Sequence, residues 1–187
     1  MSLWKMEKDQ LLNLPNKFTL LRFFLSLLLI PLLYFSGKKT SFIAAILFLI
    51  ASISDFFDGY IARNNHKKTI IGEIMDPMAD KTLVVVSLIM LVHLDRVPTW
   101  IAALIASREF FVSGLRISSL KLGMEMKVNI WGKAKTTLQM ISLLFLIAHY
   151  PIYGLNLHKI GILLIYISLV VTLYSGYLYL REFLESI

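Results

Sequence analysis

Six long apolar runs constrain this chain more than any other feature of its sequence. Most of them approach or exceed the roughly 20 residues that an α-helix needs to cross the hydrocarbon core of a bilayer. The third run is short, and we expect its helix to begin earlier, near Gly72, with a polar first turn. The sequence therefore predicts an all-α membrane protein with six transmembrane helices. The runs are Phe18–Phe35, Ser41–Ile61, Ala79–His93, Thr99–Leu120, Gly132–Tyr150 and Lys159–Phe183.

The composition agrees with this interpretation and excludes other classes of protein. Only 17% of the 187 residues are charged, whereas soluble domains carry about 25% charged residues. The formal net charge of +7 could attract either nucleic acid or an anionic membrane surface together with phosphorylated substrates. Because apolar runs separate the basic residues, we expect membrane lipid and no nucleic acid as partner. Since the chain has no cysteine, disulfides and thiolate metal sites are excluded.

Basic residues predict the orientation, because they gather on the cytoplasmic side of membrane proteins. We expect a multi-pass protein of the cell membrane with both termini in the cytoplasm and a single domain over residues 1–187. Residues 1–17 would form a juxtamembrane segment, with a short interfacial helix over Leu3–Leu14 or a disordered tail, and 18–187 the transmembrane core. The basic-rich side would hold Lys5, Lys8, Lys17, Arg63, Lys67, Lys68, Lys81, Arg116, Lys121, Lys127, Lys133, Lys135 and Arg181, and the other side Lys38, Lys39, Arg96 and Lys159.

Acidic residues concentrate where the second predicted helix ends and the third begins. Asp55 and Asp58 are three residues apart, and Asp76 and Asp80 are four apart. Side chains at these spacings share one face of a helix. A short basic turn over 64–69 joins the two helices, so the two faces can meet. Four carboxylates would then converge in one pocket at the cytoplasmic boundary.

Such a cluster requires positive charge, because neighbouring carboxylates repel one another and raise one another's pKa. Arg63 alone cannot neutralise four acids, and a donor set of oxygens favours Mg²⁺ or Mn²⁺ over zinc. Gly59, Ala62 and Gly72 leave room beside the metals for an extended group, and Arg63 suits a phosphate. The residues therefore predict metal-assisted phosphoryl transfer at the membrane surface.

Two other interpretations of the acids stay open at this point. The acids could cap helix ends, and Asp76 followed by Pro77 is typical of an N-cap and a first helical position. We keep that capping role for Asp76 beside the metal role. The acids could also form the ion site of a cation transporter, although such sites tend to lie near the middle of the bilayer.

The spacing of these residues is that of a known signature, D-x-x-D-G-x-x-A-R-x8-G-x-x-x-D-x-x-x-D. It falls on Asp55, Asp58, Gly59, Ala62, Arg63, Gly72, Asp76 and Asp80. In these positions the chain resembles the CDP-alcohol phosphotransferase family. The resemblance implies six transmembrane helices, a homodimer, and a cytoplasmic active site with one or two divalent metal ions. It also implies metal ligands at Asp55, Asp58, Asp76 and Asp80, a general base at Asp80, and CDP binding by Asp55, Gly59, Ala62, Arg63 and Gly72.

Other stretches narrow the resemblance within the family. The segment Leu14–Arg22, the residues Ser107–Glu109 with Arg116, and the segment Gly132–Met140 are similar to the bacterial members that make phosphatidylglycerophosphate. This similarity implies CDP-diacylglycerol as the donor and sn-glycerol 3-phosphate as the acceptor, with CMP as the second product. Another acceptor, such as an inositol phosphate or serine, is the alternative within the family.

Basic residues near the fourth and fifth runs are candidates for binding the acceptor phosphate. Arg108 lies well inside the fourth run, where a charge needs a partner or an aqueous cavity. Arg116 follows about two turns later, and Lys133 and Lys135 open the fifth run. These four cations would suit a dianionic phosphate. Alternatively, Arg108 pairs with an acid in the bundle and the lysines only set the orientation. We expect Glu109 to orient one of the cations.

Three further groups of polar residues complete the sequence analysis. Thr19 and Arg22 are candidates for contact with the lipid-linked phosphate of the donor. We interpret the four histidines as interfacial residues, because none has metal-ligand spacing to another. We interpret Lys121 and Lys127 as residues that set the orientation in the membrane. The histidines are His66, His93, His149 and His158.

Overall fold

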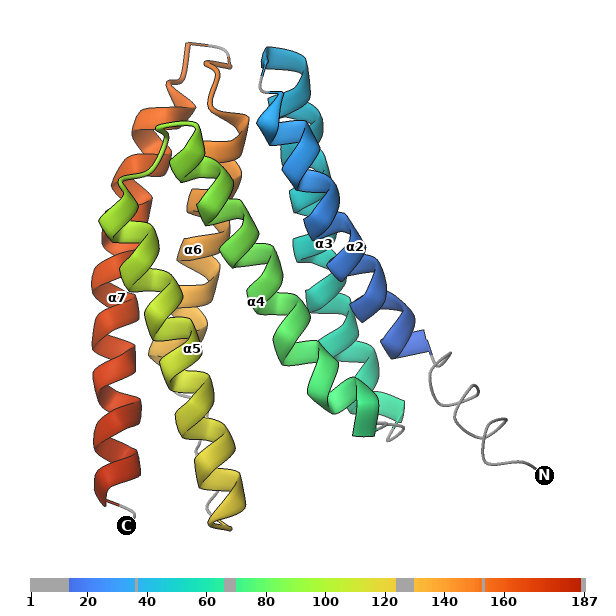
Figure 1. Cartoon of the computed structure of the whole chain (residues 1–187), viewed down its shortest axis with the longest axis vertical. Coiled ribbons are helices and arrows are strands. Elements are labelled where there is room, and N and C mark those ends of the chain that lie inside the picture. Colours follow the sequence, from blue (N-terminus) through green and yellow to red (C-terminus); the bar gives the residue numbers. More distant parts are fainter. Residues whose placement is uncertain (1–13, 36, 66–69, 124–129, 153, 186–187) are drawn as a thin grey trace, which may run out of the picture. The chain divides into compact units, whose positions relative to one another are not determined.

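Helices account for most of the residues that the computed structural model describes (Figure 1). The structure describes residues 14–35, 37–65, 70–123, 130–152 and 154–185. Within these ranges, the backbone alone is described at 14–19, 55–65, 70–77, 80 and 120. The helices are α2 (Leu14–Tyr34), α3 (Lys38–Asn65), α4 (Ile70–His93), α5 (Thr99–Lys121), α6 (Ile130–Ala148) and α7 (Leu157–Glu185).

The observed helices follow the six predicted apolar runs closely, so the all-α prediction is confirmed for the described residues. Helix α4 begins at Ile70, close to the predicted start near Gly72. Asp76 and Pro77 therefore lie inside α4, and the prediction that Asp76 caps this helix is wrong. The interfacial helix predicted over Leu3–Leu14 lies, except for Leu14, outside the described residues.

Among the described residues, α7 is the one helix long and apolar enough to cross a membrane. Shorter apolar helical segments of the described part cover Leu20–Tyr34 in α2 and Lys81–His93 in α4. In α5, the charged residues Arg108, Glu109 and Arg116 interrupt the apolar sequence.

The chain divides into two compact units, Met1–Met90 and Leu91–Ile187. In the first unit, α2 packs against α3. Leu29 and Leu33 of α2 and Phe48 of α3 are buried, and the small side chains of Ala44 and Ala51 also lie in this core. Burying these apolar side chains stabilises the unit by excluding them from solvent.

In the second unit, α7 packs against both α6 and α5. Gly161 lets α6 approach closely, because a Cβ at this position would lie 2.7 Å from Cγ of Leu146. The hydroxyl of Ser142 in α6 donates a hydrogen bond to the Gly161 carbonyl at 3.0 Å. Helix α7 therefore serves as the common wall on which residues of α5 and α6 are brought together.

A buried arginine joins the loop before α5 to the end of α6. Arg96 is 4% exposed, and its Nη1 donates to the carbonyls of Leu146 at 3.3 Å and Ile147 at 2.9 Å. The last carbonyls of a helix lack partners within the helix, so a cation there satisfies them and suits the helix dipole. The neighbouring Asp95 has a positive φ of 54°, which turns the chain sharply into this contact.

Candidate active site

The acidic signature residues lie on the two helices of the first unit that the motif predicted. Asp55, Asp58, Gly59, Ala62 and Arg63 belong to α3, and Gly72, Asp76 and Asp80 belong to α4. Since both segments are helical, each pair of aspartates shares a helical face, as predicted. Their side chains are outside the described part of the structure, so their roles stay predictions.

The chemistry of this donor set fits a hard divalent cation. The fixed positions of the motif offer four carboxylates and include no histidine or cysteine, and magnesium and manganese prefer oxygen ligands. The helical backbone at both aspartate pairs places the donors of each pair on one side of their helix. Among the side chains that the structure describes, no group of three His, Asp or Glu residues could hold a metal; the four signature aspartates are not among them.

The two candidates for the lipid-linked phosphate both lie on α2. The side chain of Thr19 is outside the described part. Arg22 is 1% exposed, so its side chain is enclosed by protein. Its contact with a donor phosphate stays a prediction.

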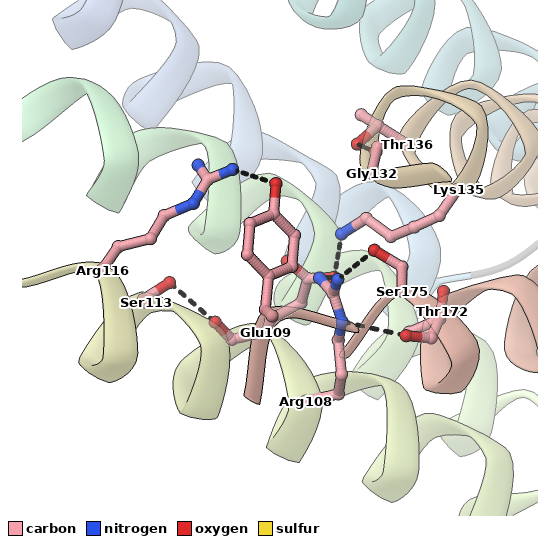
Figure 2. A network of polar contacts seen from close by, with 10 residues as sticks. Arg108, Glu109, Ser113, Arg116, Gly132, Lys135, Thr136, Thr172 and Ser175 are labelled. Atoms are coloured by element: carbon pink, nitrogen blue, oxygen red, sulfur yellow. Dashed lines mark hydrogen bonds and ion pairs between the residues drawn. The ribbon is translucent and has the colours of Figure 1, made fainter. Parts of the chain in front are cut away.

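In the second unit, Arg108 of α5 reaches across to α7 (Figure 2). The side chain is only 9% exposed, and Nε donates to the carbonyl of Thr172 at 3.0 Å while Nη2 donates to Oγ of Ser175 at 2.8 Å. Gly176 makes room for this arrangement, because a Cβ there would lie 3.3 Å from Cγ of Arg108. The position of the guanidinium is thus set by the shape and polar atoms of α7.

Glu109 is the carboxylate of this network. Its Oε1 accepts a hydrogen bond from Nζ of Lys135 in α6, and Nη1 of Arg108 lies 3.6 Å from the same oxygen. The side chains of Lys135 and Glu109 are 8% and 12% exposed. The prediction that Glu109 orients a cation is confirmed. Arg108 also has the acidic neighbour that the alternative interpretation required, so its contact with substrate stays a prediction.

Arg116 and Lys133 are the exposed ones among the four predicted cations. Nη2 of Arg116 donates to the hydroxyl of Tyr179 at 2.6 Å, and the guanidinium carbon is 4.9 Å from the centre of the tyrosine ring. The rest of the Arg116 side chain is accessible. Lys133 is exposed in the first turn of α6, next to Gly132. The structure therefore joins Arg108 and Lys135 through Glu109 and holds Arg116 on Tyr179. Lys133, two residues from Lys135 along α6, projects from a different side of that helix.

We call Arg108, Glu109, Arg116 and Lys135 the basic cluster. Its cationic side chains outnumber its carboxylate. In the described part of the second unit, Arg108 and Lys135 contact the carboxylate of Glu109, and Arg116 is bound to the hydroxyl of Tyr179. Charges that are enclosed by protein are costly unless an opposite charge compensates them. An anion from solution would complete the balance, and Arg116 is the exposed cation of the basic cluster that it can reach.

Helix α7 contributes polar groups to the basic cluster that were not predicted from the sequence. Thr172, Ser175 and Tyr179 look ordinary in an apolar helix, but they recur at intervals of three and four residues. That spacing places them on one face. A stripe of polar groups along an otherwise apolar helix was the signal that could have found them.

Comparisons with known proteins converge on one family. Residues 12–174 match the family model described as CDP-alcohol phosphatidyltransferase. Three relatives share the name CDP-diacylglycerol–glycerol-3-phosphate 3-phosphatidyltransferase. The protein of Rickettsia typhi is 39% identical over 170 residues, covering 90% of this chain and 96% of the relative. The Bacillus subtilis protein is 36% identical over 187 residues, with coverages of 94% and 97%. The Haemophilus influenzae protein is 34% identical over 174 residues, with coverages of 90% and 92%.

Proposed function

The chain belongs to the CDP-alcohol phosphatidyltransferase family, and on this premise we propose that it transfers the phosphatidyl group of CDP-diacylglycerol to sn-glycerol 3-phosphate. The products would be phosphatidylglycerophosphate and CMP. Similarity along nearly the whole chain to relatives with that named activity supports the choice of substrates. Within the structure, the observation that carries the acceptor assignment is the excess positive charge of the basic cluster.

We further propose that all six helices cross the cell membrane as a homodimer, with both termini and the active site facing the cytoplasm. The asymmetry of basic residues supports this orientation. The acyl chains of the donor would remain among the apolar side chains, and glycerol 3-phosphate would enter from the cytoplasm. This geometry explains why the reactive polar residues concentrate near helix ends in a largely apolar chain.

On the donor side, Asp55, Asp58, Asp76 and Asp80 would hold one or two Mg²⁺ or Mn²⁺ ions. A bound metal ion would neutralise charge on the diphosphate and on the departing CMP. Gly59, Ala62 and Gly72 would leave space for the cytidine diphosphate to lie against the backbone. Arg63 would donate hydrogen bonds to its phosphate oxygens.

The reaction needs one proton transfer and one displacement at phosphorus. Asp80 would accept the proton of the glycerol 3-phosphate hydroxyl that attacks. The resulting oxygen would form a bond to the phosphorus attached to diacylglycerol, while the bond from that phosphorus to CMP breaks. Arg63 would stabilise the charge that develops on the phosphoryl oxygens.

On the acceptor side, the contacts of the basic cluster suggest a division of labour. Arg108 and Lys135 have protein partners already, so they would supply a positive field from within the helices. Arg116 and Lys133 are accessible, so we assign the direct contacts with the acceptor phosphate to them first. Arginine suits this task because its planar fork matches phosphate oxygens.

The decisive experiment measures CMP release by the purified protein in detergent with CDP-diacylglycerol and Mg²⁺. The acceptor would be glycerol 3-phosphate, myo-inositol 1-phosphate, serine or none. We expect release with glycerol 3-phosphate only, its loss on adding a chelator, and its recovery with excess Mg²⁺ or Mn²⁺. Release with another acceptor would overturn the assignment of the basic cluster, and no release with any acceptor would overturn the proposed function.

A matched pair of variants tests the acceptor side separately. Arg116→Ala should raise the apparent KM for glycerol 3-phosphate by about tenfold or more, because it removes a charged hydrogen-bond donor. Lys121→Ala removes an exposed cation from the same helix outside the basic cluster and should leave that KM unchanged. Equal KM values in the two variants would contradict a specific phosphate contact at Arg116.

A further inference from the structure

An accessible arginine rests on a buried tyrosine at the border of the basic cluster. Tyr179 of α7 is 2% exposed, while Arg116 of α5 is exposed. The 2.6 Å hydrogen bond between them joins one nitrogen of the guanidinium to the tyrosine hydroxyl. An arginine side chain on a surface otherwise has many rotamers, and ordering it costs conformational entropy. Here the hydrogen bond to Tyr179 orders the Arg116 side chain in the absence of a ligand.

The tyrosine hydroxyl is itself enclosed by the first turn of α6. A Cβ at Gly132 would lie 3.2 Å from that hydroxyl oxygen and 3.8 Å from Oγ of Ser175. Side chains at position 132 would therefore press on the hydroxyl. Three helices thus define the position of the Tyr179 hydroxyl. Helix α7 carries it, α6 confines it, and Arg116 of α5 donates a hydrogen bond to it.

The remaining guanidinium donors of Arg116 are left for another partner. A guanidinium has five N–H donors in a fixed plane, and the hydrogen bond to Tyr179 uses one of them. The ring of Tyr179, 4.9 Å from the guanidinium carbon, adds a favourable contact with the cation. The guanidinium is consequently held at one edge while the rest of its fork remains accessible.

We infer that Tyr179 is a positioning residue for the acceptor phosphate, acting through Arg116. This inference rests on the proposed function, because it assigns Arg116 to the phosphate of glycerol 3-phosphate. Tyr179 does not touch the substrate in this scheme. Its hydroxyl selects the rotamer of Arg116 that presents the free fork, and Gly132 keeps that hydroxyl in place. Preorganisation of this kind increases affinity by lowering the entropy lost on binding.

Tyr179→Phe tests the inference by removing only the hydroxyl. We expect the apparent KM for glycerol 3-phosphate to rise about three- to tenfold, with kcat and the KM for CDP-diacylglycerol unchanged. In the Arg116→Ala background the same substitution should have no further effect on the acceptor KM. The exposed Tyr177 of α7 provides the control, since Tyr177→Phe removes a hydroxyl from the same helix and should change neither KM.

The outcomes separate this inference from the proposed function. If CMP release by the unmodified protein does not depend on glycerol 3-phosphate, the proposed function fails. If release depends on glycerol 3-phosphate and Tyr179→Phe keeps the original acceptor KM, the inference alone is overturned. A rise in both KM values together would also overturn it, because that result indicates a general structural role.

A second variant covers the case in which Tyr179→Phe does not fold, which its thermal midpoint in detergent would reveal. Gly132→Ala adds a methyl group close to the hydroxyl and leaves Tyr179 itself intact. We expect it to raise the acceptor KM with the donor KM unchanged. An unaltered acceptor KM in a folded Gly132→Ala protein would count against the positioning role.

Discussion

Each unit of the molecule contains one concentration of charged residues, acidic in the first and basic in the second, and the chain assembles the two in different ways. In the first unit, residues 1–90, four acids and Arg63 lie within one continuous motif at the ends of two consecutive helices. In the second unit, residues 91–187, the basic cluster draws on α5, α6 and α7, and its geometry depends on polar atoms of α7. One site can therefore be read along the chain, and the other exists only once the helices have packed.

Under the proposed function, the two regions would reach charge balance in opposite ways. The four aspartates of the first region would bind metal ions from solution, and the cations near Glu109 in the second would bind an anion. A metal-bound diphosphate would complete the first region and a phosphate monoester the second.

The largest effect is expected in the acidic region. Asp80→Asn should lower the rate of CMP release on the order of a thousandfold, because it removes the carboxylate that we propose accepts the proton and holds metal. Asp95→Asn is the matched control, since Asp95 is exposed at a turn and asparagine tolerates its positive φ. Near-normal turnover by an Asp80→Asn protein that binds metal normally would remove the base from the mechanism.

The next largest effect tests whether Glu109 stabilises the basic cluster. Glu109→Gln should reduce the free energy of unfolding by about 3 kcal/mol, because it leaves enclosed cations without their counterion. The thermal midpoint in detergent would measure the change. Glu185→Gln interrupts the exposed ion pair with Arg181 and should leave the midpoint where it is. If Glu109→Gln and Glu185→Gln have the same thermal midpoint, the basic cluster is less enclosed than the structure indicates.

A third variant tests whether the buried Arg96 affects stability without affecting the acceptor KM. Arg96→Ala should cost about 2 kcal/mol of stability, because two carbonyls at the end of α6 lose a charged donor. The acceptor KM of the folded protein should not change, since Arg96 contacts the end of α6 and not the basic cluster. A raised acceptor KM would show that the end of α6 and the basic cluster are coupled.

The smallest effect concerns pH. His149 lies between α6 and α7, and burial, with further contributions from Arg96 and His158, lowers the pKa of His149 below its ordinary value of 6.5. Since the folded protein binds this proton less readily than the unfolded chain, the stability contribution is complete above pH 6.5 and is lost as the pH falls below that value. Melting curves from pH 7 to 5 should show less loss for His149→Asn, which suits the local φ of 57°. Equal slopes would contradict the prediction.

Sequence alone predicted the helices well because the apolar runs are long and are bounded by charged or turn-forming residues. Helix α4 was the hardest to delimit, because its first turns carry Glu73 and Asp76 and no continuous apolar run. The predicted capping role of Asp76 followed from reading that polar stretch as a helix start. The helical backbone in fact runs through it, which places both Asp76 and Asp80 on one helix.

The basic cluster could be predicted only in part. Position within an apolar run identified Arg108, and proximity identified Glu109 as its neighbour. The roles of Ser175, Gly176 and Tyr179 depend on how α5 and α6 pack against α7, and the spacing of residues in one helix does not encode that packing. From the sequence, Arg96 was predicted only to lie on the side of the membrane that has few basic residues. Its contact with the end of α6 arises from the same tertiary packing.

The ion pair between Glu109 and Lys135 also has a consequence for biogenesis. In a chain delivered to the bilayer from its N-terminus, α5 emerges with Arg108 and Glu109 before α6 supplies Lys135. A charged residue near the centre of a spanning helix costs about 2.5–3.5 kcal/mol on insertion scales. If α5 crosses the bilayer as proposed, it should therefore integrate inefficiently alone and be retained when α6 follows. A nascent chain that ends after Lys121 should therefore be retained in the bilayer less efficiently than one that ends after Ala148.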